Sequence, residues 1–212
     1  MNKTEAVLFD VDGTLLDTRE FIYRAFEHAF RRHGAVPAAR ARVDEVIGAP
    51  LLECYGLLAP EHDARALCMY HRAFQLENIH LSEPFPKAVE VLKGLREAGI
   101  RTAAVTSRSR RTSLATLESA GMMRMLDAVI SGEDARRLKP HPDPLLLALA
   151  GLGVKPEKAF MVGDTAADIL AGKNAGTGTI GVTYGFHGGK IKENGPDHTV
   201  DDISGILPII LK

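Results

Sequence analysis

The chain of 212 residues has a mass of 22.9 kDa, and its 26 basic and 27 acidic side chains leave a formal charge of −1. With 45% apolar residues it has the composition of a globular protein, and it lacks the positive field with which proteins bind nucleic acid or acidic membranes. The two cysteines, Cys54 and Cys68, are too few for a disulfide framework and are expected to be reduced and buried. The longest apolar run, residues 145–154, is too short to span a bilayer, and Glu5 and Asp10 interrupt any early secretory segment, so we expect a cytoplasmic protein.

Short apolar segments, each running into polar residues, predict buried strands at residues 6–9, 101–105, 127–130, 159–162 and 178–182. Segments with helical spacing, often begun by proline or ended by glycine, predict helices at residues 87–98, 108–120, from about 142, and 165–175. This regular alternation indicates an α/β fold in which a doubly wound parallel sheet is covered by helices on both faces.

Residues 17–81 break the alternation, because they show helical patterns and no strand. Asp17 and Glu20 have the spacing of a capping box at the start of the first of these helices. We therefore expect a small all-helical domain over residues 17–81, inserted into a core made of residues 1–16 and 82–212.

Polar residues cluster where the predicted strands end. Asp10-Val-Asp12-Gly13-Thr follows the first strand, Thr106-Ser107 follows the second, and Asp164 and Asp168 follow the strand at residues 159–162. A further candidate, Lys139, stands in a loop that prolines stiffen just before a helix. Since the carboxyl ends of parallel strands form the ligand crevice of an open sheet, these side chains are expected to lie together.

Aspartates that meet in one crevice repel each other unless a cation lies among them. Mg²⁺ suits such a site better than a soft metal, because no cysteine or paired histidine is offered. Lys139 and Thr106 would add a positive charge and a donor for an anionic substrate, which describes a phosphate site. A carboxylate such as Asp10 can attack phosphorus, while Asp12 can donate and later accept a proton. Gly13 allows the sharp turn that lets both carboxylates face the crevice.

In order and approximate spacing, these clusters resemble the four motifs of the haloacid dehalogenase superfamily of phosphohydrolases over nearly the whole chain. The resemblance implies a Rossmann-like core with strand order 5-4-1-2-3 and the Asp10 strand at its centre. It implies Asp10 as nucleophile and Asp12 as general acid and base. The residues that it implies for phosphate binding are Thr106, Ser107 and Lys139, with Gly13 beside them. The residues that it implies for Mg²⁺ binding are Asp10, Asp164 and Asp12, the last through its main-chain carbonyl. Asp168 would contribute to the metal site directly or through another ligand.

A helical insertion after the first motif resembles the C1-type cap of the branch that acts on small molecules. No lysine stands between Lys3 and Lys87, which excludes the relatives that cleave phosphonates through a cap Schiff base. Asp12 argues against a dehalogenase, because those relatives lack the second aspartate. Residues 46–51, 155–168 and 171–176 resemble phosphoglycolate phosphatases and a related group of pyrophosphatases.

The stretch His71-Arg72-Ala-Phe is similar to a Tyr-Arg-x-Phe stretch in the cap of those pyrophosphatases, but it carries His in place of Tyr and is followed by Gln75 in place of Asn. The departures favour a small phosphomonoester, similar to phosphoglycolate, over pyrophosphate, with Arg72 as a cap cation near the substrate. A sugar-phosphate mutase and a receiver-like signalling module remain as alternatives. Receivers are shorter, and they lack a helical lid and a proton donor two residues after the phosphorylated aspartate. The expected partners are Mg²⁺ and a small phosphorylated metabolite, and the sequence decides neither the leaving group nor the oligomeric state.

Overall fold

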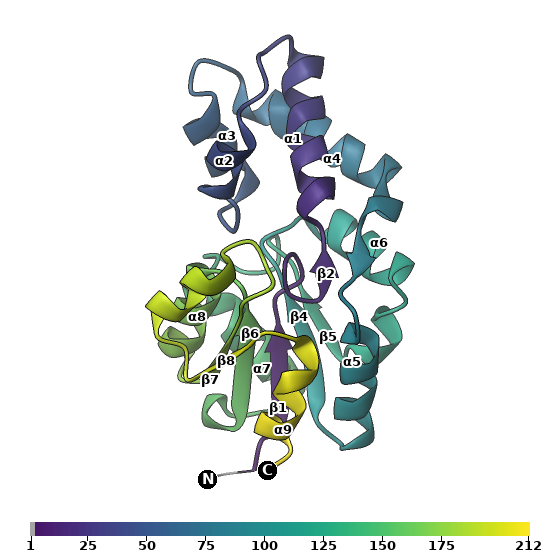
Figure 1. Ribbon diagram of the computed structural model, residues 1–212, viewed down its shortest axis with the longest axis vertical. Helices are drawn as coiled ribbons and strands as arrows, with labels where there is room; N and C mark the ends of the chain where they lie inside the picture. The colour runs from purple at the N-terminus through teal and green to yellow at the C-terminus, as the bar shows by residue number, and fades with distance from the viewer. Residues whose placement is uncertain (1–2) are drawn as a thin grey trace.

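The computed structural model describes residues 3–212 and contains a six-stranded parallel sheet with the order β5-β4-β1-β6-β7-β8 (Figure 1). Its strands are β1 (Ala6–Phe9), β4 (Arg101–Val105), β5 (Ala128–Ile130), β6 (Ala159–Gly163), β7 (Gly178–Val182) and β8 (His198–Val200). The predicted strands are confirmed, and their order is the expected 5-4-1-2-3, which β8 extends at the β7 edge. Residues 1 and 2, which the predicted core includes, lie outside the described residues.

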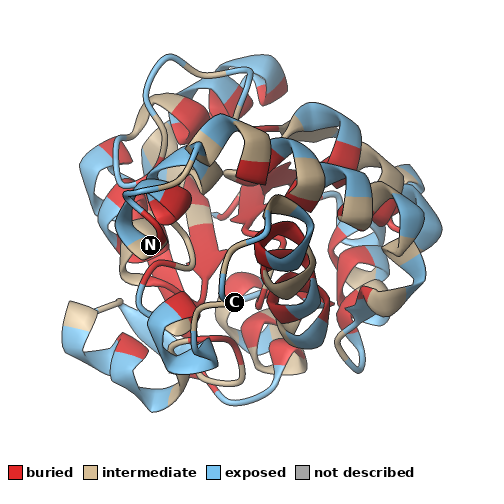
Figure 2. Cartoon of the chain, turned by 90° about the horizontal axis from the view of Figure 1, so that it is seen from above, coloured by how far each residue is buried: buried red, intermediate tan, exposed pale blue. Residues whose placement is uncertain are grey.

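Helices cover both faces of the sheet, as predicted. Side chains alternate along β1, so that Val7 and Phe9 pack on one face and Ala6 and Leu8 on the other. The first face is covered by α5 (Ala88–Glu97), α6 (Arg110–Ser119) and α9 (Leu207–Ile210). The second is covered by α7 (Asp143–Leu152) and α8 (Ala166–Ala175). Burial on both faces protects the inner strands β1, β4, β6 and β7, and buried residues, drawn in red, gather at the centre of Figure 2.

The chain also contains short 3-10 helices: η1 (Ile79–Leu81), η2 (Met123–Met125), η3 (Pro156–Lys158), η4 (Gly188–Asn194) and η5 (Ile203–Ile206). No helix within residues 3–212 combines the length and the apolar character that crossing a membrane requires.

The helical segment after β1 stands beyond one end of the sheet, opposite the two chain termini (Figure 1). Its helices are α1 (Arg19–His33), α2 (Arg40–Asp44), α3 (Leu51–Leu58) and α4 (Ala64–Glu77). They enclose a hydrophobic cluster of their own, which contains Phe26, Phe30 and Tyr55. The chain enters the segment through β2 (Leu16–Asp17) and leaves it through β3 (Glu83–Pro84), and the two pair antiparallel. The helical segment is thus tied to the core by two adjacent strands.

The predicted capping box at Asp17 and Glu20 is wrong. The N-cap of α1 is Thr18, whose side chain makes no capping bond, because Asp17 is held in the β2 pairing. The carboxylate of Glu20 turns instead to Arg24 and Arg40 on the protein surface. The spacing fits a capping box, but the Asp17 carboxylate accepts from the Arg19 N–H, at 3.3 Å, and Glu20 is held in ion pairs.

Candidate active site

The loop after β1 places two carboxylates at the end of the sheet that faces the helical segment. The backbone of Asp10 still follows the sheet, since its N–H donates to the Val162 carbonyl at 2.9 Å. The chain then turns at Gly13, which has a φ of +83°. A Cβ at Gly13 would lie 2.4 Å from Oδ2 of Asp164, so glycine is required for both conformation and space. The turn brings the first and last predicted motifs into contact.

Lys139 connects three strand ends. Its Nζ donates to Oδ1 of Asp10 at 2.6 Å, to Oδ1 of Asp168 at 2.7 Å and to the Val105 carbonyl at 2.9 Å. The residue is 6% exposed, so its charge is compensated by protein rather than by water. Burial disfavours the ammonium ion, but the two carboxylates outweigh burial and raise the pKa of Lys139. The lysine therefore stays charged and fixes one oxygen of Asp10.

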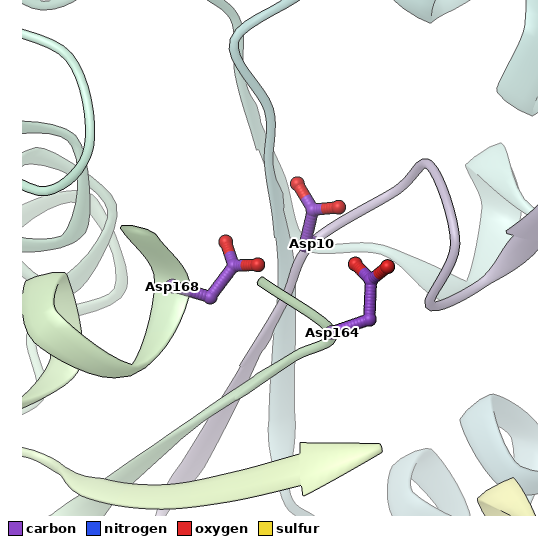
Figure 3. A group of neighbouring side chains, drawn as sticks. All are labelled: Asp10, Asp164 and Asp168. Carbon is purple, nitrogen blue, oxygen red and sulfur yellow. The ribbon is translucent and has the colours of Figure 1, made fainter. Parts of the chain in front are cut away.

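The carboxylates of Asp10, Asp164 and Asp168 lie beside one another, from the loop after β1, the loop after β6 and the first turn of α8 (Figure 3). One oxygen from each can be chosen so that all lie within 4.8 Å of one another. Oδ2 of Asp168 accepts from the N–H and the hydroxyl of Thr165 at 3.0 and 2.7 Å, and its Oδ1 accepts from Lys139. Both oxygens of Asp168 are thus engaged, and this carboxylate chiefly holds Lys139.

Asp164 is fully buried, and its hydrogen-bond donors are neutral. Its Oδ1 accepts from Thr14 Oγ1 at 3.3 Å and its Oδ2 from the Phe186 N–H at 2.6 Å. Burial, followed by repulsion from Asp10 and Asp168, raises the pKa of Asp164 well above its ordinary value. Burial is also the main cause that raises the pKa of Asp10 to about 7, against the opposing effect of Lys139. A second cation bound here would relieve this excess of negative charge, and an all-oxygen ligand set fits Mg²⁺.

A cavity of about 240 Å³ opens above Asp10 and Lys139, between the core and the helical segment. Asp12, Thr106, Ser107 and Arg72 line it together with these two residues, whereas Asp164 and Asp168 are not among its lining residues. The helical segment closes it with apolar side chains from Ile22, Phe26, Ile47, Leu51 and Leu52. The predicted catalytic and phosphate-binding residues therefore line one cavity, except Gly13, which is not among its lining residues. The two later aspartates lie next to Asp10 outside the lining.

Ser107 and Thr106 follow β4 directly, but their hydroxyls have different partners. Oγ of Ser107 donates to the Gly48 carbonyl of the helical segment at 3.4 Å. Oγ1 of Thr106 accepts from the Arg108 N–H at 3.2 Å, and the residue is 4% exposed. Ser107 thus contacts the segment at residues 46–51 that the sequence singled out, and Thr106 faces the cavity from the core.

Arg108 is a site residue that the sequence analysis missed. Its Nη1 lies 3.2 Å from Oδ1 of Asp12, and the two side chains are only 10% and 14% exposed. Its Nη2 donates to the Thr116 hydroxyl at 3.1 Å, and its guanidinium carbon lies 5.3 Å from the centre of the Phe21 ring, a cation–π contact. The residue stands two positions after Thr106 at the same strand end, and this position is the sequence signal for it.

Helix α4 supplies the polar part of the cavity wall on the side of the helical segment. His71, Arg72 and Gln75 all line the cavity, and His71 and Gln75 are buried. Nδ1 of His71 lies 2.9 Å from the Tyr55 hydroxyl, within hydrogen-bonding distance. Burial, helped by Arg108 and Arg72, lowers the pKa of His71 to about 3. His71 is therefore neutral at physiological pH.

The buried neutral state of His71 predicts a pH-dependent stability. Between about pH 6.5 and pH 3 the unfolded chain binds a proton at this histidine and the folded chain does not, so stability falls as the pH falls. From pH 7 to pH 5 the loss attributable to His71 is about 2 kcal/mol. The substitution His71→Asn keeps a polar group near the Tyr55 hydroxyl but cannot titrate, and it should remove this loss.

Urea unfolding of the wild type and of His71→Asn at pH 7 and pH 5 measures how much stability each protein loses between the two pH values. His80→Asn, at an exposed histidine, serves as the control and should keep the slope of the wild type. An equal loss of stability in His71→Asn and wild type would contradict the assignment of a buried neutral histidine.

Comparison with known proteins agrees with this geometry. Residues 7–182 match the family described as haloacid dehalogenase-like hydrolase. The chain is 35% identical over 205 residues to the pyrophosphatase PpaX of Halalkalibacterium halodurans, covering 96% of this chain and 95% of that protein. It is also 35% identical over 209 residues to the PpaX pyrophosphatase of Bacillus velezensis, covering 98% and 96%.

Solved structures show the same fold over the full length. A predicted phosphoglycolate phosphatase from Haemophilus somnus superimposes with a TM-score of 0.90 at 25% identity, covering 99% of each chain. A haloacid dehalogenase-like hydrolase from Bacteroides fragilis gives a TM-score of 0.86 at 28% identity, covering 96% of this chain and all of that one. The family match covers most of the chain and contains all of the predicted motifs, and the chain therefore belongs to the haloacid dehalogenase-like hydrolases.

Proposed function

We propose that this protein is a Mg²⁺-dependent phosphatase that hydrolyses a small phosphomonoester through an aspartyl-phosphate on Asp10. The observation that carries the proposal is the bridge from Lys139 to Asp10 and Asp168 at the edge of the cavity, with Asp164 beside it. This arrangement supplies a nucleophile and a cation that are both held in place. Its group of carboxylates carries more negative charge than Lys139 neutralises, which favours binding of a second cation.

The first step transfers the phosphoryl group to the protein. Since Lys139 holds Oδ1 of Asp10, the other carboxylate oxygen attacks phosphorus as the bond to the leaving oxygen breaks. Asp12, which lines the same cavity, gives its proton to that oxygen. Lys139 and Thr106 bind the phosphoryl oxygens. When bound, Mg²⁺ would be held by Asp10, Asp164 and the main-chain carbonyl of Asp12, and it would neutralise charge on the phosphoryl group.

The second step releases phosphate. Asp12 takes a proton from a water molecule, the water oxygen forms a bond to phosphorus, and the bond from phosphorus to Asp10 breaks. The helical segment limits the water that reaches this point, because its side chains form the roof of the cavity. A cavity of about 240 Å³ supports a small metabolite as the substrate, rather than a nucleic acid or a protein surface.

The second candidate function is hydrolysis of inorganic pyrophosphate. It is favoured by the likeness to the two PpaX pyrophosphatases, each of which is 35% identical to this chain. Arg72 and Arg108 line the cavity beside Lys139, and these cations suit a leaving group with a negative charge of its own. Both a carboxylate, as in phosphoglycolate, and a second phosphate meet that requirement.

A substrate panel tests the proposal and separates the candidates. We expect the purified protein to release phosphate from at least one of 2-phosphoglycolate, pyrophosphate, hexose phosphates, nucleoside monophosphates and p-nitrophenyl phosphate. Removal of Mg²⁺ with a chelator should abolish release, and Mg²⁺ added back should restore it. A preference for pyrophosphate would decide for the second candidate, and release that is indifferent to the chelator would contradict the metal site.

A further inference from the structure

Arg19 connects the start of α1 to the loop that follows β7, residues 183–187. Its Nη2 donates to the Gly185 carbonyl at 2.8 Å, and its guanidinium carbon lies 4.9 Å from the centre of the Phe186 ring. The side chain is 42% exposed, so these contacts hold it against the loop although water can reach it. One arginine of the helical segment thus fixes two neighbouring residues of the core.

The same two residues hold the carboxylate of Asp164. The N–H of Phe186 donates to Oδ2 of Asp164 at 2.6 Å. A Cβ at Gly185 would lie 2.3 Å from Cβ of Asp164, so the loop backbone packs directly on this aspartate. Since a shift of the loop would move the donor and the packing surface together, the orientation of Asp164 depends on where residues 185 and 186 lie.

Phe186 also belongs to the hydrophobic interior of the helical segment. Its side chain is 9% exposed and is part of the cluster formed by Phe26, Phe30 and Tyr55. The backbone of this residue therefore contacts the carboxylate group of the core, while its ring is packed with the helices above. Arg19 holds the residue at that junction.

We propose that Arg19 is a positioning residue that sets the affinity of the site for Mg²⁺ through Gly185 and Phe186. The proposal rests on the proposed function, in which Asp164 holds the metal. Groups that orient a metal ligand by hydrogen bonds change metal affinity when they are lost, commonly by 10- to 100-fold. Because α1 carries the arginine, the position of the helical segment and the binding of Mg²⁺ are coupled, and each influences the other to the same extent.

The substitution Arg19→Met keeps the aliphatic stem and removes the guanidinium. We expect Mg²⁺ to bind about 10-fold more weakly to this variant in isothermal titration calorimetry of the full chain. Phosphate release at saturating Mg²⁺ should return to near the wild-type rate, because Arg19 does not line the cavity above Asp10. Arg19→Lys keeps a donor for the Gly185 carbonyl and should bind Mg²⁺ with an affinity between those of wild type and Arg19→Met.

Arg31→Met is the matched control. It makes the same chemical change on the same helix, where Arg31 pairs with Glu27 at 2.6 Å on the surface. Its Mg²⁺ affinity should equal that of the wild type, as should its metal-free unfolding temperature.

Equal Mg²⁺ affinity in Arg19→Met and wild type would overturn the proposal, even if the variant were less stable. A loss of activity that saturating Mg²⁺ does not restore would also overturn it, because Arg19 would then act through the fold alone. Failure of the wild type itself to bind Mg²⁺ would instead contradict the proposed function on which this inference rests.

Discussion

The substitution Asp10→Asn is expected to lower the rate of phosphate release by roughly 10⁴-fold or more. Asparagine has the shape of aspartate and can still accept from Lys139, which holds Oδ1 of Asp10 at 2.6 Å. Its amide nitrogen is not a nucleophile, so no covalent bond to phosphorus forms. The loss should therefore appear in kcat with every substrate of the panel, including p-nitrophenyl phosphate.

The fold should tolerate this change. Burial raises the pKa of Asp10 to about 7, so in metal-free protein the ionised carboxylate destabilises the folded state as the pH rises through this value. Asparagine removes one negative charge from the group that contains Asp164 and Asp168. Metal-free Asp10→Asn should consequently unfold at the same temperature as the wild type or higher, measured by circular dichroism at pH 8.

Two further measurements make the nucleophile assignment decisive. Acid-quenched wild type should carry a phosphoryl group on the peptide that contains Asp10, detected by mass spectrometry, and Asp10→Asn should carry none. Asp63→Asn is a suitable control, because Asp63 is the N-cap of α4 and asparagine caps helices equally well. The assignment would fail if Asp10→Asn retained even a tenth of the wild-type rate.

The location of the candidate site could be predicted from sequence because most of its residues stand directly after buried strands, whereas Lys139 stands in the loop before α7. Apolar runs such as residues 6–9 and 159–162 are specified by burial on both faces of a parallel sheet, and the polar residues that follow them must then lie at one edge. The topology of the sheet brings Asp10, Lys139 and Asp164 together, and the local sequence pattern is sufficient to predict that topology.

Features that depend on tertiary contacts were not predicted. β2 and β3 have two residues each and contain Asp17, Glu83 and Pro84, which carry no strand pattern. β8 is three residues long, and two of them are exposed. The contacts of Arg19 with Gly185 join residues 166 positions apart, and no local spacing signals them. Sequence reasoning therefore identified the chemical groups, whereas the structure was needed to show what orients them.

The substitution Asp12→Asn should lower kcat for alkyl phosphates by about 10²- to 10⁴-fold, the usual contribution of a general acid and base. Asparagine keeps an oxygen that can accept from Arg108, which lies 3.2 Å from Oδ1 of Asp12, so the side chain should stay in place. It can neither give a proton to the leaving oxygen nor take one from water. Both chemical steps are then slowed, but not equally for every substrate.

Substrates with different leaving groups distinguish the role of Asp12 as proton donor in the first step from its role as base in the second. The p-nitrophenolate anion needs little protonation, so Asp12→Asn should still transfer the phosphoryl group of p-nitrophenyl phosphate to Asp10 in the first turnover. Hydrolysis of the aspartyl-phosphate should remain slow, since water has lost its base. Rapid mixing should therefore show a burst of p-nitrophenolate equal to the enzyme concentration, followed by a slow steady state. An equal slowing of the first turnover for p-nitrophenyl and alkyl phosphates would show that Asp12 does not act as the proton donor to the leaving group.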